Sequence, residues 1–243
     1  MKRLDVLAIS PHPDDVELAC GGTVALLAAA GKRVGILHLT RGEAGSRGTV
    51  EERRGEAERA AEALGVERFE FLDCGDGALR SGAPEEDALI DRLRQLRPEL
   101  VLGPPPADRH PDHGRAHALV AAAVFYSGLA KRGDQNLKPH RPGVVFHYML
   151  HDAFEPRFVV DVSATWEKRF AALAAYDSQL YQGESTGEHG PQTKVASREY
   201  RLAVEGRARH FGLLIGAEFG EPFGSRLPLS VADPFSLVPG GLR

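Results

Sequence analysis

The sequence predicts an α/β protein with a Rossmann-like, doubly wound and mostly parallel sheet that carries helices on both faces. Two observations lead to this fold class. Short apolar runs alternate with amphipathic stretches over residues 1–130, in a β-α-β-α-β-α-β-α order. The apolar runs are nearly continuous, which is typical of strands buried on both faces of a parallel sheet. Repeated βα units favour such a sheet with helices packed against it.

The first half of this pattern rests on apolar content and helix-ending signals. Residues 4–10 (LDVLAIS) and 34–40 (VGILHLT) are predicted strands because they are almost wholly apolar. Residues 21–31 are rich in alanine and leucine, which favours a helix. Residues 49–65 carry apolar side chains at helical spacing, and Gly65 is a suitable C-cap.

The second half continues the alternation and then changes it. Residues 69–72 and 100–103 are short apolar strands, separated by a helix at 84–96 that ends before Pro98. An alanine-rich helix is predicted at 113–129. A β-β-α-α extension then follows, with strands at 144–150 and 158–162 and helices at 164–181 and 197–215.

Length and composition narrow the class of protein. The chain has 243 residues, which favours one large domain, and we interpret 1–130 as its metal-binding core and 131–243 as a substrate-side extension. Hydrophobic residues make up 42% and charged residues 26%, which excludes a disordered or fibrous chain. The net charge of -4 argues against nucleic acid as the main partner.

Three further features indicate the compartment. Two cysteines, Cys20 and Cys74, cannot form a disulfide framework, so a reducing compartment is the simpler interpretation. The apolar run at the N-terminus is too short for a signal peptide. No stretch approaches the roughly 18 apolar residues that a membrane span needs. We therefore expect a cytoplasmic protein that does not interact with a membrane.

Two polar clusters follow predicted strands directly. Residues 11–17 (PHPDDVE) come after the first strand, and residues 108–113 (DRHPDH) come after the fourth. In a doubly wound sheet, ligands bind at the carboxyl ends of the strands, where the strand order reverses. The first and fourth strands are neighbours across that point in the usual order. The fold is therefore expected to bring the two clusters together.

Imidazole and carboxylate groups in these clusters suit a divalent metal such as zinc. His12, Asp15 and His113 form a possible ligand set, and three protein ligands plus a water are typical of a catalytic site. Such a metal lowers the pKa of its water to about 7. Asp14 could then accept the proton of the water as a general base. His110, held as an imidazolium by Asp112, could face a developing oxyanion.

Structural roles are the alternative for each cluster taken alone. Proline and aspartate are ordinary turn residues, and Asp14 or Asp15 could simply cap the first helix. Residues 110–113 could likewise form a turn and a helix cap. Two such clusters at matching strand ends are harder to explain as turns, which favours function. Among the other histidines, His38 lies inside the second predicted strand and is expected in the core or near the surface, and His117 is more consistent with packing or surface exposure than with ligation.

For two loops and one arginine, the sequence is consistent with either a ligand-binding role or a purely structural role. Residues 40–49 lie on the same rim, and their glycines permit a close backbone approach to a ligand or a flexible loop. Thr49, at the end of this segment, fits a capping box with Glu52. Arg53 could hold an anionic group of a substrate, or belong to a solvated helix face. Residues 182–193 could be a binding loop or a plain connection.

The sequence lacks the motifs that are typical of several enzyme classes. The sequence contains no G-x-G-x-x-G and no Walker A pattern, so nucleotide cofactors are not indicated. It contains no G-x-S-x-G, which disfavours a serine hydrolase. A phosphoesterase often uses two metals bridged by carboxylates, whereas only one set of two histidines and an aspartate is evident. A non-catalytic metal- or sugar-binding module remains the third alternative.

The sequence closely resembles the LmbE-like (PIG-L) N-deacetylases. The resemblance rests on PHPDDVELACGGT near the N-terminus and DRHPDH about 95 residues later. RGEAGSRGTVEERRGEAERAAEALGV, FVVDVS, YDSQ and RARHFGLLIGAEFGEPF are similar to the bacillithiol-biosynthesis branch. The resemblance therefore covers nearly the whole chain.

The resemblance implies an activity and assigns roles to residues. It implies a zinc enzyme that removes the acetyl group from N-acetylglucosaminyl-malate; free N-acetylglucosamine and chito-oligosaccharides are the alternative substrates. The implied zinc ligands are His12, Asp15 and His113, with one zinc per chain, although Fe²⁺ or cobalt could use the same ligands. The general base is Asp14, and His110, supported by Asp112, stabilises the oxyanion. Arg53 and Arg109 suit the malate as anion contacts. A homo-oligomer, often a hexamer, is also implied.

Overall fold

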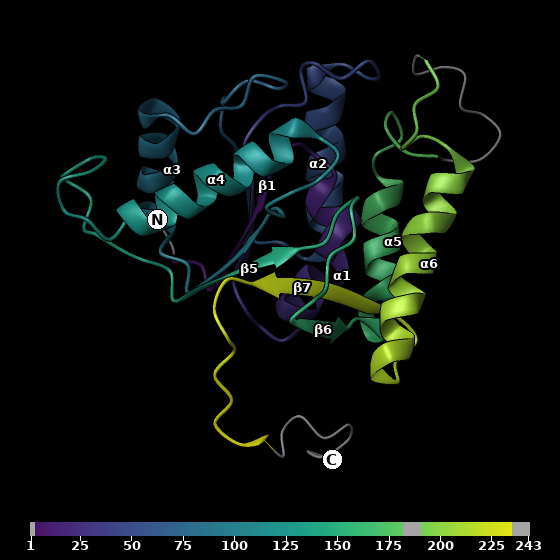
Figure 1. Cartoon of the computed structure of the whole chain (residues 1–243). Helices are drawn as coiled ribbons and strands as arrows, with labels where there is room; N and C mark the ends of the chain where they lie inside the picture. The colour runs from purple at the N-terminus through teal and green to yellow at the C-terminus, as the bar shows by residue number, and fades with distance from the viewer. Residues whose placement is uncertain (1–2, 182–190, 235–243) are drawn as a thin grey trace.

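A seven-stranded sheet lies between two layers of helices in the computed structural model, which describes residues 3–181 and 191–234 (Figure 1). The strands are β1 (Val6–Ser10), β2 (Val34–His38), β3 (Arg68–Phe71), β4 (Leu100–Gly103), β5 (Val144–Tyr148), β6 (Phe158–Asp161) and β7 (Gly220–Ser225). The helices are α1 (Asp15–Ala29), α2 (Val50–Leu64), α3 (Ala83–Leu96), α4 (Pro111–Tyr126), α5 (Trp166–Ala174) and α6 (Arg198–Ile215), with a 3-10 turn η1 (Ser163–Thr165).

The strand order is β3-β2-β1-β4-β5-β7-β6, which confirms the predicted doubly wound, mostly parallel sheet. Strands β1 to β5 all run parallel to one another, and β7 is antiparallel to both β5 and β6. The predicted pairing of β1 with β4 is confirmed, since Val6 lies opposite Leu100 and Ala8 opposite Leu102. Strand order reverses between these two strands, and in sheets of this kind ligands bind outside the carboxyl ends of the strands at that point.

Side chains of β1 enter the cores on opposite faces of the sheet, because alternate residues of a strand point to opposite sides. Val6 and Ala8 pack in the core formed with α1, α2 and α5. Leu7 and Ile9 pack in the core formed with α3 and α4. Figure 1 shows α3 and α4 on one side of the strands and α1, α2, α5 and α6 on the other. No helix in these described ranges is long and apolar enough to cross a membrane.

The first helix begins earlier than predicted. α1 begins at Asp15, directly after the polar cluster, rather than at residue 21. Cys20 has φ -145° and ψ 24°, outside the helical region, so α1 is kinked there. The prediction identified the part after the kink, which is rich in alanine and leucine, and missed the polar part before it. The first turn lies entirely buried, although it contains Asp15 and Glu17.

The C-terminal extension also differs from the prediction. The helix predicted at 164–181 is the 3-10 turn η1 followed by the shorter α5, which ends at Ala174. Strand β7 was not predicted, because GEPFGS contains two glycines and a proline and lacks a strand-like composition. Its pairing with β5 and β6 makes the extension β-β-α-α-β. The earlier part of the fold matches the predicted order of strands and helices.

Candidate active site

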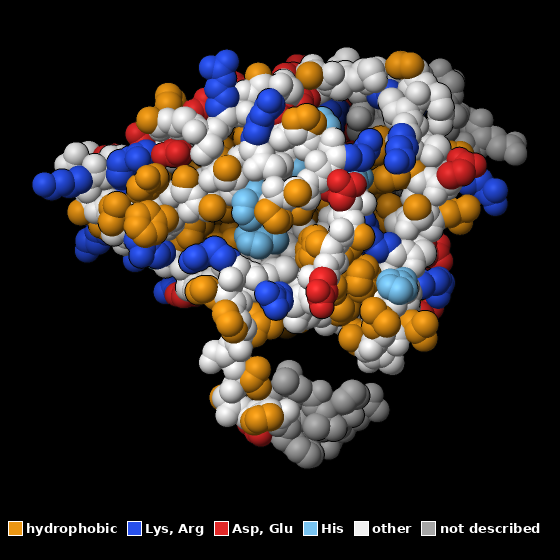
Figure 2. Space-filling model, viewed as in Figure 1, with side chains coloured by type: hydrophobic (Ala, Val, Ile, Leu, Met, Phe, Trp, Pro, Cys, Tyr) orange, Lys and Arg blue, Asp and Glu red, His pale blue; other side chains and the backbone are white. Residues whose placement is uncertain are grey.

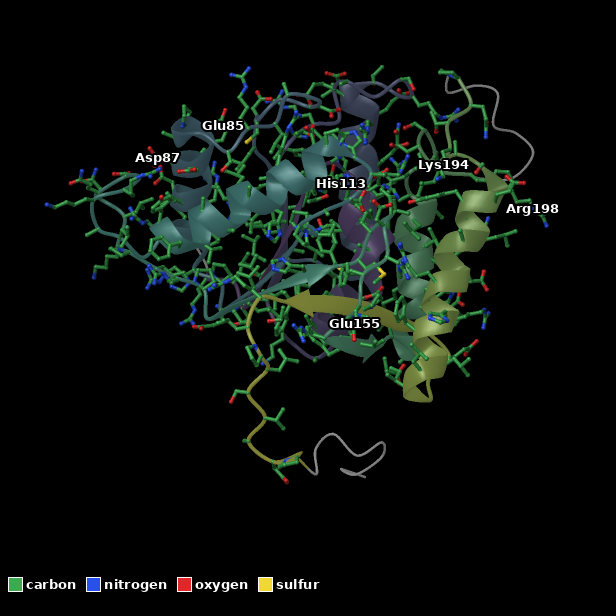
Figure 3. The ribbon with its side chains drawn as sticks, viewed as in Figure 1. Glu85, Asp87, His113, Glu155, Lys194 and Arg198 are labelled. Carbon is green, nitrogen blue, oxygen red and sulfur yellow. The ribbon has the colours of Figure 1, made fainter. Side chains whose placement is uncertain are left out.

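The two polar clusters meet at the carboxyl ends of β1 and β4. Nδ1 of His12 lies 3.1 Å from Oδ2 of Asp15, and Nε2 of His113 lies 3.5 Å from Oδ1 of Asp15. All three side chains are buried, with His113 only 1% exposed. Figure 3 labels His113, which lies in the middle of the molecule at the end of α4 that approaches α1. Two imidazoles thus flank the buried carboxylate of Asp15, one at each of its oxygens.

Each of the two histidines has a second carboxylate on its other ring nitrogen. Nδ1 of His113 lies 2.9 Å from Oδ1 of Asp108. Nε2 of His12 lies 3.1 Å from Oδ1 of Asp76, as an ion-pair contact rather than an aligned hydrogen bond. Metal-binding histidines almost always have such a carboxylate or carbonyl on their second nitrogen. The donors and their partners therefore fit a bound divalent metal.

The donor atoms of neighbouring residues extend this centre. Three overlapping sets have donor atoms within 4.8 Å of one another, namely His12/His110/His113, Asp15/His113/His151 and His12/Asp76/Asp112. Burial disfavours charge on the His12 ring, but the carboxylates of Asp112, Asp15 and Asp76 outweigh it and raise the pKa of His12. The centre therefore stabilises positive charge on this imidazole, which is also what a cation would supply.

Asp14 occupies the N-cap position of α1 but does not cap it. Its side chain makes no hydrogen bond to the helix end, and its backbone adopts φ 101°, in the left-handed region. For a non-glycine residue such a conformation costs on the order of 1–3 kcal/mol. Burial and the neighbouring charge of Asp15 raise the pKa of the Asp14 carboxyl well above its usual range. The structure therefore contradicts the helix-cap alternative for Asp14.

His110 contacts Asp112 in a different way from the one predicted. The backbone N–H of Asp112 donates to Nδ1 of His110 at 3.2 Å, which requires that nitrogen to be unprotonated. Burial, together with the nearby rings of His12 and His113, lowers the pKa of His110. The expected contact between the His110 ring and the Asp112 carboxylate is therefore wrong, because the main chain of Asp112 faces Nδ1 instead, and the lowered pKa favours the neutral ring.

The carboxylate of Asp112 points elsewhere. It accepts the backbone N–H of Gly77 at 2.8 Å and pairs with Nη1 of Arg115 at 3.0 Å. Its Oδ2 lies 3.5 Å from Nε2 of His12. Asp112 is fully buried, so it links α4 to the loop after β3 and to the His12 ring. Its contact with His110 is made through the main chain.

The two arginines occupy different environments. Arg53 is 5% exposed and donates to the carbonyls of Gly42, at 2.7 Å, and Pro13, at 3.1 Å. It therefore links α2 to the turn that precedes Asp14. Arg109 is exposed beside His110. Burial lowers the pKa of His151 to about 4, and the positive charge of Arg109 contributes to this shift.

Sequence reasoning missed three residues of this centre. Asp76 lies on the loop after β3, and Asp108 lies at the start of the second cluster but had no predicted role. His151 follows β5, and its ring stacks on His113 at 5.5 Å between centroids. Its Nδ1 lies 2.9 Å from the hydroxyl of Tyr200 on α6. The position of Asp76 and His151 after strands of the same sheet is the signal that could have found them.

The remaining predictions have simple outcomes. Thr49 and Glu52 form the predicted capping box, with both reciprocal hydrogen bonds present. His38 is buried and stacks on Phe71, which confirms a core position. Nδ1 of His117 lies 3.1 Å from the carbonyl of Pro104, in agreement with packing. Most of the predicted loop at 182–193 lies outside the described residues.

The segment at 40–49 forms hydrogen bonds with the loop after β3 and with the segment after α5. The backbone N–H of Ala44 donates to Oδ2 of Asp76 at 2.9 Å, and the backbone N–H of Asp76 donates to Glu43 at 2.8 Å. Arg47 is 2% exposed and donates to the carbonyl of Ser178 at 2.6 Å. The segment therefore holds Asp76 close to His12, with 3.1 Å between Oδ1 of Asp76 and Nε2 of His12.

Comparisons with known proteins agree with this geometry. The GlcNAc-PI de-N-acetylase (PIG-L) family matches residues 7–124. A diacetylchitobiose deacetylase of Thermococcus kodakarensis is 36% identical over 189 residues, covering 72% of this chain and 70% of that protein. The conserved protein TT1542 of Thermus thermophilus has a TM-score of 0.83 and 39% identity, covering 95% and 98% of the two chains. The N,N'-diacetylchitobiose deacetylase of Pyrococcus horikoshii has a TM-score of 0.76 and 27% identity, covering 91% and 82%.

Proposed function

Because the chain belongs to the GlcNAc-PI de-N-acetylase family, we propose that it is a metal-dependent hydrolase that removes the N-acetyl group from an N-acetylglucosamine unit. One observation carries the proposal. His12, Asp15 and His113 converge beside Asp14, a buried carboxyl group that makes no hydrogen bond to the helix it precedes. Such a set matches metal-assisted attack of water on an amide carbonyl.

Zinc is the proposed metal, one ion per chain, held by His12, Asp15 and His113. Iron(II) is the alternative, since the same nitrogen and oxygen donors suit both ions. When bound, the ion supplies Lewis-acid polarisation of the carbonyl and an acidified water. Asp108 and Asp76 then fix the orientation of the two imidazoles through their second nitrogens.

Asp14 is the proposed general base. Burial and the charge of Asp15 raise its pKa toward neutral pH. A base whose pKa is near the working pH is still partly ionised and also accepts a proton readily. Arg53 holds the carbonyl of Pro13 and so fixes the turn on which Asp14 lies. We assign Arg53 a positioning role on this ground; the earlier assignment of a substrate contact stays a prediction.

His110 is the proposed donor to the oxyanion that forms as water adds to the amide. Its Nδ1 is occupied by the N–H of Asp112, which leaves the Nε2 proton available to the substrate. A neutral imidazole suits this task, because the hydrogen bond strengthens as negative charge develops on the oxygen. Asp112 is proposed as the residue that positions His110.

N-acetylglucosaminyl-malate is the proposed substrate. The likeness of FVVDVS, YDSQ and RARHFGLLIGAEFGEPF to the bacillithiol branch supports it. Arg109 supports it as well, since an exposed guanidinium beside the centre suits a malate carboxylate. The second candidate is diacetylchitobiose, the substrate named for the relatives from Thermococcus kodakarensis and Pyrococcus horikoshii.

The test compares amine release from three substrates, N-acetylglucosaminyl-malate, diacetylchitobiose and free N-acetylglucosamine, under one set of conditions. Preference for the malate conjugate, lost in Arg109→Ala, supports the first candidate. Preference for diacetylchitobiose, unchanged in Arg109→Ala, supports the second and refutes the first. Release from none of the three by metal-loaded protein refutes the proposed activity. About one zinc per chain in the active protein would distinguish this mechanism from a two-metal phosphoesterase.

Two further proposals concern the protein in the cell. Its free cysteines, Cys20 and Cys74, support a reducing compartment and hence the cytoplasm. The family resemblance supports a homo-oligomer, with a hexamer as the expected size. Light scattering coupled to size exclusion measures that mass directly, and a monomer would refute it.

A further inference from the structure

The kink in α1 frees backbone groups that an unbroken helix would pair with each other. In a regular helix the N–H of Gly22 donates to the carbonyl of Leu18, four residues before it. Here the N–H of Gly22 donates to Oε1 of Glu221 at 2.9 Å, and the N–H of Thr23 donates to Oε2 at 2.7 Å. Glu221 lies on β7 and thus caps the second part of α1 from a distant strand.

The carbonyls before the kink also find a partner outside the helix. Nε of Arg169 donates to the carbonyl of Glu17 at 3.1 Å, and Nη2 donates to the carbonyl of Leu18 at 2.6 Å. Arg169 lies on α5 and pairs with Glu221, with 3.4 Å between Nε and Oε1. Their exposed fractions are 2% and 1%. The buried ion pair therefore joins the two parts of α1.

The glycines at the kink fit closely around this pair. A Cβ atom on Gly21 would lie 3.2 Å from Cγ of Arg169. A Cβ atom on Gly22 would lie 2.9 Å from Oε1 of Glu221 and 2.8 Å from Cβ of Val162. Three sequence motifs without a role in the chemistry thus meet here, ACGGT on α1, FVVDVS at β6 and EFGEPF at β7. The kink is built from distant parts of the chain.

We propose that Arg169 and Glu221 are positioning residues for the metal site, because they fix the direction of the first part of α1. That part starts with Asp14 and Asp15 and lies between the kink and the His12 turn. If the ion pair served only to join α5 to β7, it would not need to form hydrogen bonds with backbone groups on both sides of the kink in α1. The inference rests on the proposed function only in taking His12, Asp15 and His113 as the metal ligands.

The test measures zinc affinity by competition with a chromophoric chelator, a readout that requires no turnover. Arg169→Lys leaves one ammonium, which cannot reach both carbonyls and Glu221. Glu221→Gln keeps the side-chain size but offers one acceptor oxygen to two N–H groups. Both variants are expected to weaken zinc binding by about 10- to 100-fold, the range for residues that orient metal ligands. Glu221→Gln, nearly isosteric, keeps the test available if Arg169→Lys does not fold.

Arg94→Lys is the matched control. Arg94 is 3% exposed and also donates to three backbone carbonyls, those of Ser127, Leu129 and Asp134, but it lies on the other face of the sheet. It should lose stability in a similar way and keep zinc affinity unchanged. Wild-type affinity in both Arg169→Lys and Glu221→Gln would overturn the inference, as would an equal loss in Arg94→Lys. The proposed function is tested separately, by the activity of the wild-type protein.

Discussion

Asp14 combines a strained backbone with a buried carboxyl group that has no hydrogen bond to the adjacent helix. Such strain persists only where surrounding contacts hold it, and it is common at active sites. The neighbouring contacts are present, since Arg53 holds the carbonyl of Pro13 and the N–H of Leu18 donates to the carbonyl of Asp14. The carboxyl group therefore does not cap the helix, and it lies close enough to Asp15 and His12 for their charges to act on its pKa.

Asp14→Asn tests its role as the base. The amide keeps the size and shape of the carboxyl group but cannot accept a proton, so kcat should fall by about a hundred- to ten-thousandfold. Zinc content should stay at the wild-type level, because Asp14 is not among the proposed ligands. Steady-state kinetics and metal analysis measure the two quantities. Unchanged turnover would remove Asp14 from the proton transfer.

Asp108→Asn tests the support of a ligand. Asp108 lies 2.9 Å from Nδ1 of His113 and accepts the N–H of His151 at 2.8 Å. Loss of the carboxylate should weaken zinc binding by about 10- to 100-fold, whereas His113→Ala should abolish tight binding. Metal retained by each variant after dialysis against a chelator gives the comparison. Full zinc content in His113→Ala would refute that ligand.

The sequence allowed His12, Asp15 and His113 to be proposed as ligands because the two clusters that contain them follow the two strands that meet at the reversal of strand order. Asp76 and His151 are also close to strand ends, but β3 and β5 are not the strands that meet at the reversal of order. Asp76 and His151 reach His12 and His113 through the conformations of the loops after β3 and β5, which a local sequence pattern does not predict. The charge state of His110 likewise depends on which group of Asp112 faces it.

At the scale of elements, α1 shows how tertiary contacts override local preference. Residues 15–19 extend the helix through a stretch that sequence reasoning left outside it, and the break at Cys20 is held by groups on α5 and β7. Strand β7 has an unfavourable composition and forms because β5 and β6 flank it. Elements with strong periodicity, such as α2 and α3, begin and end close to their predicted bounds.

Gly22→Ala tests the close packing at this break. The new methyl group would meet Val162 and Glu221 at under 3.0 Å, so the free energy of unfolding should fall by about 1–3 kcal/mol. Gly206→Ala is the matched control within α6, where an added Cβ meets nothing within 4 Å. That change should raise stability by about 0.4–1 kcal/mol. Urea unfolding of both variants measures the difference, and equal effects would show that the kink tolerates a side chain.

At the scale of the whole molecule, the candidate metal centre joins the ends of four strands of the sheet. Its donors and their partners come from the ends of β1, β3, β4 and β5. Figure 2 shows histidine side chains near the middle of the viewed face, whereas His12 and His113 are themselves buried. A ligand that binds only the folded chain stabilises it in proportion to the logarithm of its concentration over its Kd. Bound zinc should therefore stabilise the whole fold.

Removal of metal should lower the midpoint of thermal unfolding. At a zinc concentration of about a hundred times the Kd, the stabilisation is about 2.7 kcal/mol, which corresponds to roughly 5–10 °C for a chain of this size. Calorimetry of metal-free and zinc-loaded protein measures the shift, with magnesium as the control ion. A midpoint that zinc does not change would mean that the folded chain has no metal site of useful affinity.

Hydrolysis of the amide tests the proposed deacetylase activity most directly. Metal-free protein, zinc-loaded protein and zinc-loaded Asp14→Asn are each incubated with N-acetylglucosaminyl-malate and with diacetylchitobiose, and both amine and acetate are quantified. We predict equal amounts of amine and acetate from the zinc-loaded wild type, and little from the other two samples. Absence of both products from the zinc-loaded wild type, or release that is independent of metal and of Asp14, would contradict the assignment of this centre as a deacetylase site.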